Sequence, residues 1–181
     1  MAKKYNISRQ AQDEFAAASY QKAEAAQKAG YFDEEIYPLT VKVVDPKTEK
    51  AVTVTVSKDD GVRPGTTVES LSKLKPAFSK EGSTHAGNAS QVSDGAAAVI
   101  LARRSVAEKH GMPIIGKFVA ASVAGVPPAI MGVGPAFAIP KLFAKTGVNV
   151  DDVDIFEINE AFASQCLYCA NVLSSLKLTN W

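Results

Sequence analysis

Short segments near the C-terminus of the sequence contain residue types that could act on a ligand. In Asn159-Glu160-Ala161-Phe162 the asparagine falls where a buried strand is predicted to end and a helix to begin. Its amide would then project from the carboxyl edge of a sheet, beside the free N–H groups of a helix N-terminus. A neutral amide there can hold a water or donate to developing negative charge. The alternative that Asn159 only caps the helix stays open.

A second segment, residues 83–90, is small and polar and leads into Asp94-Gly95-Ala96. Small residues with a glycine let another group approach the backbone closely, although many ordinary loops have this composition. The glycines of Met131-Gly132-Val133-Gly134-Pro135 are similar to a phosphate loop. Because GxGxxG is not satisfied and no Lys-Ser/Thr pair follows, nucleotide binding is not predicted.

The two cysteines, Cys166 and Cys169, lie three residues apart on the helix predicted after Asn159. They are too few for a disulfide scaffold, so nothing points to secretion, and a reducing or intracellular compartment is expected. One CxxC without a second pair is a weak zinc signal, so we predict no metal site. A buried structural thiol is the favoured interpretation.

Composition excludes several classes of protein. The chain has 181 residues, 46% hydrophobic and 22% charged, with a formal net charge of +1. This is enough for one domain or slightly more, and it excludes whole-chain disorder. The near-neutral charge gives no footprint for nucleic-acid binding. Residues 118–140 carry no charge, but their many glycines and prolines argue against a membrane span. The polar start shows no export signal.

The first half of the chain predicts a helix and a hairpin. Residues 8–30 are helical, with Ser8 as N-cap and Gly30 as the stop. Two strands with a turn between them follow. The alternation of apolar and polar residues predicts one buried face and one solvent-exposed face. The apolar face expected on the helix consists of Ile7, Ala11, Phe15 and Ala18, and the strands are Leu39–Val44 and Ala51–Ser57.

The second half alternates apolar strands with helices. A capping box of Ser105 and Glu108 starts one helix, the next ends at Gly147 with its regular part mostly after Pro140, and the last begins at Glu160. This order predicts an α/β layered core with a mixed or parallel sheet. The strands expected are Ala96–Ala102, Ile114–Ala124 and Asp154–Ile158.

Taken together and in register, these segments resemble the thiolase family, and within it the peroxisomal 3-ketoacyl-CoA type. The resemblance extends from about Ile7 to Gln165. The motifs that carry it are Ile7-Ser8-Arg9 with Gln12-Asp13-Glu14-Phe15, Asp60-Gly61-Val62-Arg63-Pro64, Gly87-Asn88-Ala89-Ser90 with Asp94-Gly95-Ala96-Ala97, Met131-Gly132-Val133-Gly134-Pro135, and Asn159-Glu160-Ala161-Phe162-Ala163.

The resemblance implies part of a layered αβαβα fold. Residues 1–92 would form the loop domain that covers coenzyme A, residues 93–112 the end of the N-terminal core half, and residues 113–181 the truncated beginning of the C-terminal core half.

The resemblance also implies roles for individual residues. Asn159 matches the asparagine that holds a water in the oxyanion hole. Ser90 and Phe78 match contacts to the pantetheine arm of coenzyme A, and Arg63 a contact near its nucleotide end. Met131 and Phe162 match the lining of the acyl tunnel. Such a lining suits a long amphipathic ligand. His85 departs from the family and is expected at the surface or rim.

The resemblance implies thiolytic cleavage of 3-oxoacyl-CoA in β-oxidation, with coenzyme A as the co-substrate. It implies no other cofactor, and it implies that the intact enzyme is a homodimer. The nucleophilic cysteine would lie upstream of Met1, and the Gly-His-Pro histidine and second cysteine downstream, so this middle portion is expected to be inactive alone. The alternative is a truncated form that binds acyl-CoA or pairs with an intact subunit. A decarboxylating or synthase relative is disfavoured by the asparagine motif. Peroxisomal location is expected, or else mitochondrial, with the targeting signal outside the chain.

Overall fold

The structure, a computed structural model, describes residues 1–174. Backbone contacts divide the chain into two compact units, which we describe separately. One unit, called here the α1 unit, is Ser8–Asn88; the other, called the α5 unit, contains Met1–Ile7 and the chain from Ala89 onward. The domain boundaries predicted at residues 92 and 112 stay predictions.

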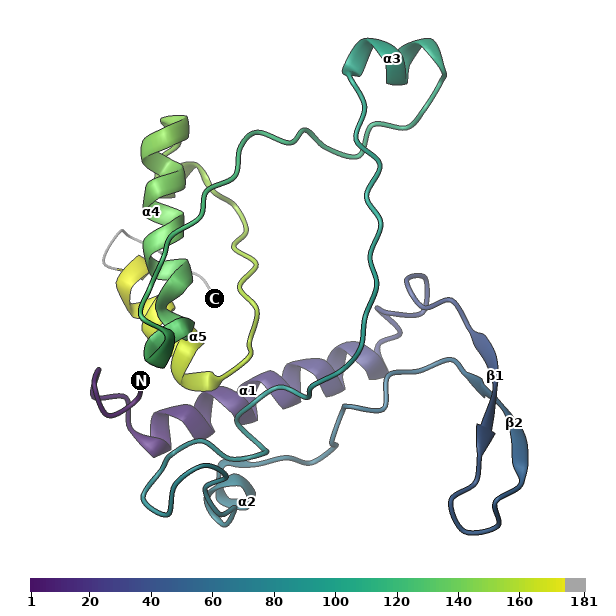
Figure 1. Ribbon diagram of the computed structural model, residues 1–181, viewed down its shortest axis with the longest axis vertical. Coiled ribbons are helices and arrows are strands. Elements are labelled where there is room, and N and C mark those ends of the chain that lie inside the picture. Colours follow the sequence, from purple (N-terminus) through teal and green to yellow (C-terminus); the bar gives the residue numbers. More distant parts are fainter. Residues whose placement is uncertain (175–181) are drawn as a thin grey trace. The chain divides into compact units, whose positions relative to one another are not determined.

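The α1 unit begins with helix α1, Arg9–Lys28, which confirms the helix predicted over residues 8–30 (Figure 1). The Ser8 hydroxyl caps it by accepting a hydrogen bond from the Ala11 N–H at 3.1 Å. After the helix, Gly30 takes a positive φ of 75° that suits glycine. The predicted buried face is wrong, because the buried residues of α1 are Gln12, Asp13, Ala16 and Ala17.

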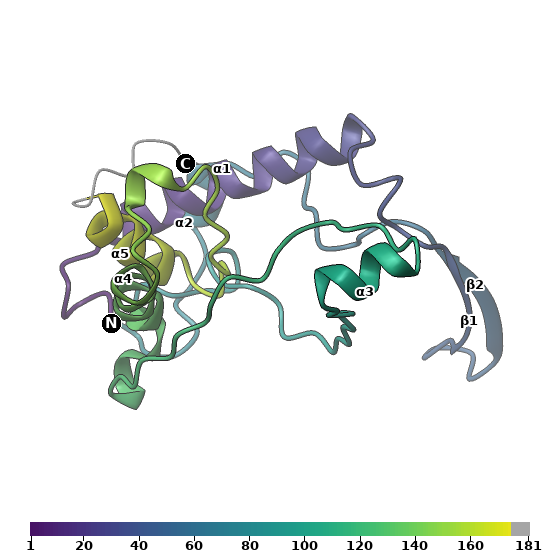
Figure 2. The same cartoon turned by 90° about the horizontal axis from the view of Figure 1, so that it is seen from above.

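The hairpin predicted after α1 is confirmed, and it extends away from the end of that helix (Figure 2). Strand β1, Leu39–Val44, pairs antiparallel with β2, Ala51–Val56. In the connecting turn, the Asp45 carboxylate accepts hydrogen bonds from two backbone N–H groups, which lowers its pKa. Every residue of both strands is exposed, so the predicted division into a buried and a wet face is wrong. A two-stranded ribbon must be covered by another layer before one face can become dry.

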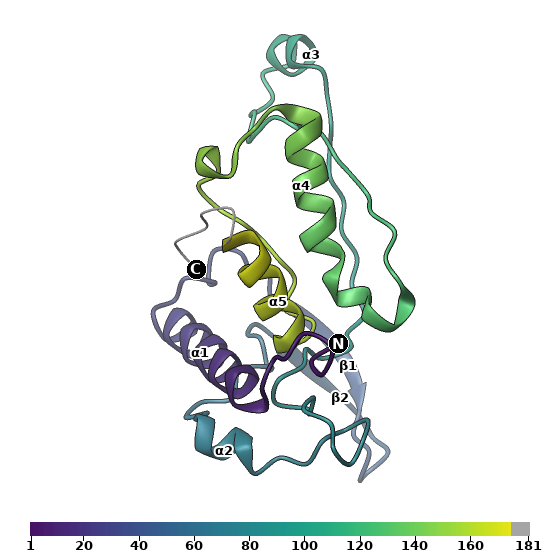
Figure 3. The ribbon, with the colours of Figure 1, turned by 90° about the vertical axis from the view of Figure 1, so that its left-hand side faces the viewer.

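A short helix, α2 at Val68–Ser72, packs on α1 and completes the core of this unit (Figure 3). The Thr67 hydroxyl accepts from the Ser70 N–H while the Ser70 hydroxyl accepts from the Thr67 N–H, which is a reciprocal capping box. Leu71 of α2 lies buried against Ala16 and Ala17 of α1. Two alanines on α1 let the helices approach closely, so a single leucine can fill the space between them.

The α5 unit centres on two helices that lie side by side, α4 at Gly134–Thr146 and α5 at Ala163–Ser174 (Figures 1 and 3). A 3₁₀ helix, η1 at Pro128–Val133, contacts both of them. The N-terminal residues of the chain also belong here, because the Tyr5 ring packs on that of Tyr168 with centroids 4.2 Å apart.

The three strands predicted in this unit are wrong. Residues 96–102, 114–124 and 154–158 are neither strand nor helix, and large side chains such as Val99 and Ile100 are exposed. A strand exists through hydrogen bonds to a neighbouring strand. Within residues 1–174 these apolar segments have no such neighbour, so they run as unpaired chain.

Helix boundaries in the α5 unit also differ from expectation. Helix α3, Arg104–Lys109, has Arg103 at its N-cap and no side-chain cap, so the predicted box of Ser105 and Glu108 is not formed. The box is out of register because Ser105 already lies inside the helix. Helix α4 starts at Gly134 and runs through Pro140, which removes one backbone donor without ending the helix. A short 3₁₀ helix, η2, covers Val150–Asp152.

No helix among residues 1–174 is long and apolar enough to cross a membrane.

Candidate functional site

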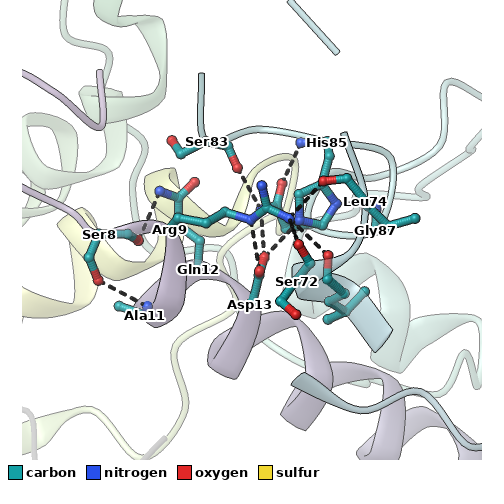
Figure 4. A network of polar contacts seen from close by, with 12 residues as sticks. Ser8, Arg9, Ala11, Gln12, Asp13, Ser72, Leu74, Ser83, His85 and Gly87 are labelled. Carbon is teal, nitrogen blue, oxygen red and sulfur yellow. Dashed lines mark hydrogen bonds and ion pairs between the residues drawn. The ribbon is translucent and has the colours of Figure 1, made fainter. Parts of the chain in front are cut away.

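The first site-forming cluster lies in the α1 unit and is built around Asp13, which the first turns of α1 carry into the interior (Figure 4). The Asp13 side chain is only 1% exposed. Its Oδ2 accepts from the Arg9 Nε at 2.7 Å. Its Oδ1 accepts from the Asn88 Nδ2 at 3.1 Å and lies 2.7 Å from the His85 Nε2. A buried carboxylate requires such partners, and here it joins residues 72 and 75 positions apart.

His85 is therefore buried, and the prediction of a surface or rim histidine is wrong. Its side chain has no exposed area, because the ring lies between α1 and its own loop. The Gly87 N–H donates to the His85 Nδ1 at 3.0 Å, so this nitrogen is an acceptor and carries no proton. The ring proton is then on Nε2, which donates to Asp13. With both nitrogens engaged, His85 in this state has no free atom for proton transfer to a ligand.

Arg9 extends this cluster to the end of helix α2. Its Nη2 donates to the carbonyl oxygens of Leu71 at 2.8 Å and Leu74 at 3.0 Å. Leu71 lies in the last turn of α2 and Leu74 just beyond its C-terminal end, where a cation suits the helix dipole. One arginine thus ties Asp13 of α1 to the C-terminal end of α2.

Gly87 has no room for a side chain, which gives a testable prediction. A Cβ atom at this position would lie 2.5 Å from the Leu71 Cδ2 and 2.8 Å from the Leu74 Cδ1. We expect Gly87→Ala to lower the free energy of unfolding by about 1–3 kcal/mol, because buried Leu71 must move. Urea denaturation followed by circular dichroism measures this. The matched control is Gly95→Ala, where nothing lies within 4 Å; equal midpoints for the two variants would contradict the expectation.

A second cluster in the α1 unit holds the loop that contains Arg63. Three side chains of α1 reach it. The Gln21 Nε2 donates to the Thr66 carbonyl, the Glu24 Oε2 accepts from the Gly65 N–H at 3.0 Å, and the Gln27 Nε2 donates to the Asp59 carbonyl. Arg63 itself is exposed and donates to the Asp60 carbonyl of its own loop. Residues three apart lie on one helix face, so this part of α1 holds the loop by one polar stripe.

The tie through Glu24 should depend on pH. The hydrogen bond from the Lys28 ammonium, and then that from the Gly65 N–H, hold the pKa of Glu24 below its ordinary value of 4.5. The depressed pKa means that the tie is fully present above 4.5 and is lost as pH falls through the lower value in the folded protein. We expect the Gly65 amide resonance in NMR spectra to titrate with a midpoint below 4.5. It should not titrate in this way in Glu24→Gln; a midpoint at or above 4.5 would contradict the tie.

Motif segments of the α5 unit also meet one another. The Ser90 N–H donates to the Ala161 carbonyl at 2.9 Å, and Ala89 forms an isolated antiparallel bridge with Phe162. The glycine segment after Met131 lies on α5, where the Cys169 Sγ donates to the Gly132 carbonyl at 3.5 Å. Residues 89–90, 131–132 and 161–169 are thus brought together by contacts to the backbone that their spacing in the sequence did not reveal.

The predicted site residues divide between the two units. Arg63 and Phe78 belong to the α1 unit, and Phe78 is 80% exposed. The others, Ser90, Met131, Asn159 and Phe162, belong to the α5 unit, where Met131 is 59% exposed and Phe162 half-buried.

Asn159 is not where the sequence pattern predicts. Residues 154–158 before it form no strand, and α5 begins four residues after it, at Ala163 rather than Glu160. Asn159 is exposed, and its backbone carbonyl accepts a weak hydrogen bond from the Cys166 Sγ at 3.7 Å. Among the described residues the segment before Asn159 has no sheet edge, and Asn159 does not cap α5, because that helix begins at Ala163. The oxyanion role of Asn159 stays a prediction.

The two cysteines are buried, as expected for structural thiols. Burial raises the pKa of Cys166 to about 12, with smaller contributions from Glu160 and Cys169, and burial also raises the pKa of Cys169. Both are therefore protonated thiols at neutral pH and poor nucleophiles. Among residues 1–174, no group of three or more His, Cys, Asp or Glu side chains could hold a metal ion.

Sequence reasoning assigned no role to Arg9, Asp13 or Asn88, although all three lie in segments that carry the family resemblance. The polar residues at positions 12 and 13 gave no distinctive signal, because polar side chains recur along the whole of this helix. A buried Asp needs partners from elsewhere in the chain, and the small, polar segment at residues 83–90 has the donors to supply them.

Solved structures that resemble this chain define its fold class. The dimeric peroxisomal thiolase of Saccharomyces cerevisiae superposes with a TM-score of 0.84 at 53% identity, covering 96% of this chain and 42% of that one. The acetyl-CoA acetyltransferase of Bacillus anthracis gives 0.86 at 42% identity, covering 98% and 43%. The described elements are thus part of the layered α/β thiolase fold.

The sequence matches two models of one protein family. The model of the thiolase N-terminal domain matches residues 1–105, and that of the thiolase C-terminal domain matches residues 112–179. The chain belongs to the thiolase family. It is 63% identical to the peroxisomal 3-ketoacyl-CoA thiolase of Yarrowia lipolytica over 93% of its length, and 59% identical to that of Homo sapiens over 96%. It spans about 40% of the length of these relatives.

Proposed function

We propose that this chain is part of an acetyl-CoA C-acyltransferase of fatty-acid β-oxidation, which cleaves 3-oxoacyl-CoA with coenzyme A to acetyl-CoA and a shortened acyl-CoA. The observation that carries the proposal is the 63% identity to a peroxisomal 3-ketoacyl-CoA thiolase over nearly the whole chain. The same similarity supports a peroxisomal location. It also supports a homodimeric intact enzyme, because the solved thiolase of Saccharomyces cerevisiae is dimeric. A mitochondrial location is the alternative.

Within this proposal, coenzyme A is the co-substrate and no other cofactor is needed. Phe78 would pack along the pantetheine arm, Ser90 would bind it, and Arg63 would contact the nucleotide end. The exposure of Phe78 supports this role, because a large apolar ring held in solvent is available to a ligand. Met131 and Phe162 would line the acyl tunnel. Asn159 would hold the oxyanion water once the segment before it is paired as a strand.

We further propose that the 181-residue chain by itself does not catalyse the reaction. Its two cysteines are both buried, and the pKa of each is raised, so neither supplies a thiolate at neutral pH. The test is acetoacetyl-CoA cleavage by the purified chain, prepared from a host that lacks thiolase. We expect no turnover above the rate without protein; cleavage that co-purifies with the chain would overturn this part of the proposal.

The same buried thiols favour a second candidate, a non-catalytic form that binds acyl-CoA or pairs with an intact thiolase subunit. Isothermal titration with coenzyme A tests the acyl-CoA-binding form directly, and no saturable heat at millimolar ligand would count against that form. Sequencing the transcript beyond the codon for Trp181 distinguishes them. A continuing reading frame with a Gly-His-Pro segment supports the enzyme, and a stop codon supports the truncated form.

A further inference from the structure

The loop that carries Phe78, residues 75–84 and called here the Phe78 loop, is closed near its base by a backbone hydrogen bond. The Ala77 N–H donates to the Thr84 carbonyl at 2.9 Å, and Ala77 directly precedes Phe78 in the chain. The Phe78 side chain is exposed, so its position is set by the backbone that carries it rather than by packing around the ring.

Both ends of the Phe78 loop are attached to helix α1 through one carboxylate (Figure 4). On the first side, the Asp13 Oδ2 accepts from the Arg9 Nε at 2.7 Å, and the Arg9 Nη2 donates to the carbonyl of Leu74, the residue before the loop, at 3.0 Å. On the other side, the Asp13 Oδ1 lies 2.7 Å from the Nε2 of His85, the residue after the loop. All of these residues belong to the α1 unit. The contacts therefore limit how far the loop can move relative to this helix.

Arg9 makes the attachment at the first end of the loop with a planar fork. While its Nε stays on Asp13, its Nη2 donates to the carbonyls of Leu71 at 2.8 Å and Leu74, and more weakly to that of Ser72 at 3.5 Å. A lysine would keep a positive charge beside Asp13, but a single ammonium nitrogen on a flexible chain does not reproduce this geometry. The variant Arg9→Lys therefore separates the charge of Arg9 from its hold on the loop.

We propose that Arg9 is a positioning residue for coenzyme A binding, which fixes the Phe78 loop and thereby the place where the Phe78 ring meets the pantetheine arm. The inference rests on the proposed function, because it takes Phe78 as a contact of that arm. Arg9 acts through the loop, since its guanidinium is engaged with Asp13 and with backbone carbonyls. A loop that is already ordered binds without the cost of ordering it, so loss of this attachment weakens binding.

The first measurement is hydrogen exchange of the Ala77 N–H, which reports closure of the loop without any ligand. We expect this exchange to be about tenfold faster in Arg9→Lys, because the Leu74 carbonyl loses a hydrogen bond from a charged group. The matched control is Arg104→Lys, since Arg104 pairs with Glu108 at the same spacing of four residues, but on an exposed helix of the α5 unit. Equal exchange rates at Ala77 in Arg9→Lys and the unmodified chain would overturn the proposal.

Coenzyme A titrations then form a double-mutant cycle with Phe78→Ala. We expect the dissociation constant to rise about tenfold in Phe78→Ala, because an apolar ring contact is lost, and about fivefold in Arg9→Lys. The double variant should bind no more weakly than Phe78→Ala, since Arg9 acts only through the ring, and Arg104→Lys should bind like the unmodified chain. Effects that add in the double variant, or an unchanged affinity in Arg9→Lys, would overturn the positioning role while leaving Phe78 as a contact.

Failure of the proposed function has a different signature. An unchanged affinity in Phe78→Ala, or no saturable binding of coenzyme A by the unmodified chain, would overturn the proposed role of Phe78 and this inference with it. The exchange rate at Ala77 would then decide only whether Arg9 holds the loop.

Discussion

Replacing Asp13 by alanine is expected to lower the free energy of unfolding by about 3–5 kcal/mol, which is the usual cost of removing one partner from a buried charged pair. The carboxylate accepts from Arg9, His85 and Asn88, so its removal leaves several donors without an acceptor. Two of these belong to buried residues that water cannot reach. The penalty therefore comes from unsatisfied buried donors rather than from the lost attraction alone.

Urea denaturation of the full chain, followed by circular dichroism at 222 nm, measures this effect. The matched control is Glu14→Ala, because Glu14 is the exposed neighbour on the same helix and contacts only the Gln10 side chain among the hydrogen bonds of the described residues. We expect the control to change stability by less than about 0.5 kcal/mol. Similar midpoints for Asp13→Ala and Glu14→Ala would show that the Asp13 cluster contributes little to the stability of the α1 unit.

The second large effect concerns the reactivity of Cys166. With its pKa raised to about 12, the thiolate fraction at pH 8 is roughly 1000-fold lower than for a thiol of pKa 9. We expect iodoacetamide to alkylate Cys166 in the folded chain about 1000-fold more slowly than in 8 M urea. Cys169, buried in the same helix, should also react slowly. Mass spectrometry of tryptic peptides after timed quenching measures both rates.

The control is an added thiol in Ser57→Cys, an exposed position just after β2, which should react at the rate of the unfolded chain. The raised pKa also predicts a pH effect on stability. Because the folded chain retains the thiol proton that the unfolded chain loses above pH 9, stability is fully present below pH 9 and falls as pH rises toward 12. Rapid alkylation of folded Cys166 at pH 8 would contradict both statements.

Elements determined by local signals could be predicted from the sequence. The residues that begin and end helix α1, the Ser8 cap and the glycine after it, lie next to the helix in the sequence. In the β1–β2 hairpin the turn directly connects the two strands that pair. The apolar segments at 96–102, 114–124 and 154–158 show the limit of such signals. Their composition suits strands, but strand formation needs a hydrogen-bonding neighbour, which the described residues do not supply.

The candidate site could be predicted only in part for a similar reason. The motif residues were found as segments, but the partner of Asp13 lies 72 residues away, and no periodicity connects two such positions. His85 was expected at the surface or rim because it departs from the family pattern at this position. Its burial depends on a carboxylate on α1, so only the folded chain reveals it.

Helix α1 sets the spacing between two loops of its own unit. Asp13 holds the loop that ends in Asn88, and Glu24 holds the loop that contains Arg63. These two attachment points are 11 residues apart, which in an α-helix corresponds to about 16 Å along the axis. One residue inserted between them would increase their separation along the helix axis by about 1.5 Å and rotate one loop by about 100° relative to the other. The number of helical residues between Asp13 and Glu24 therefore sets both the distance and the relative orientation of the two loops.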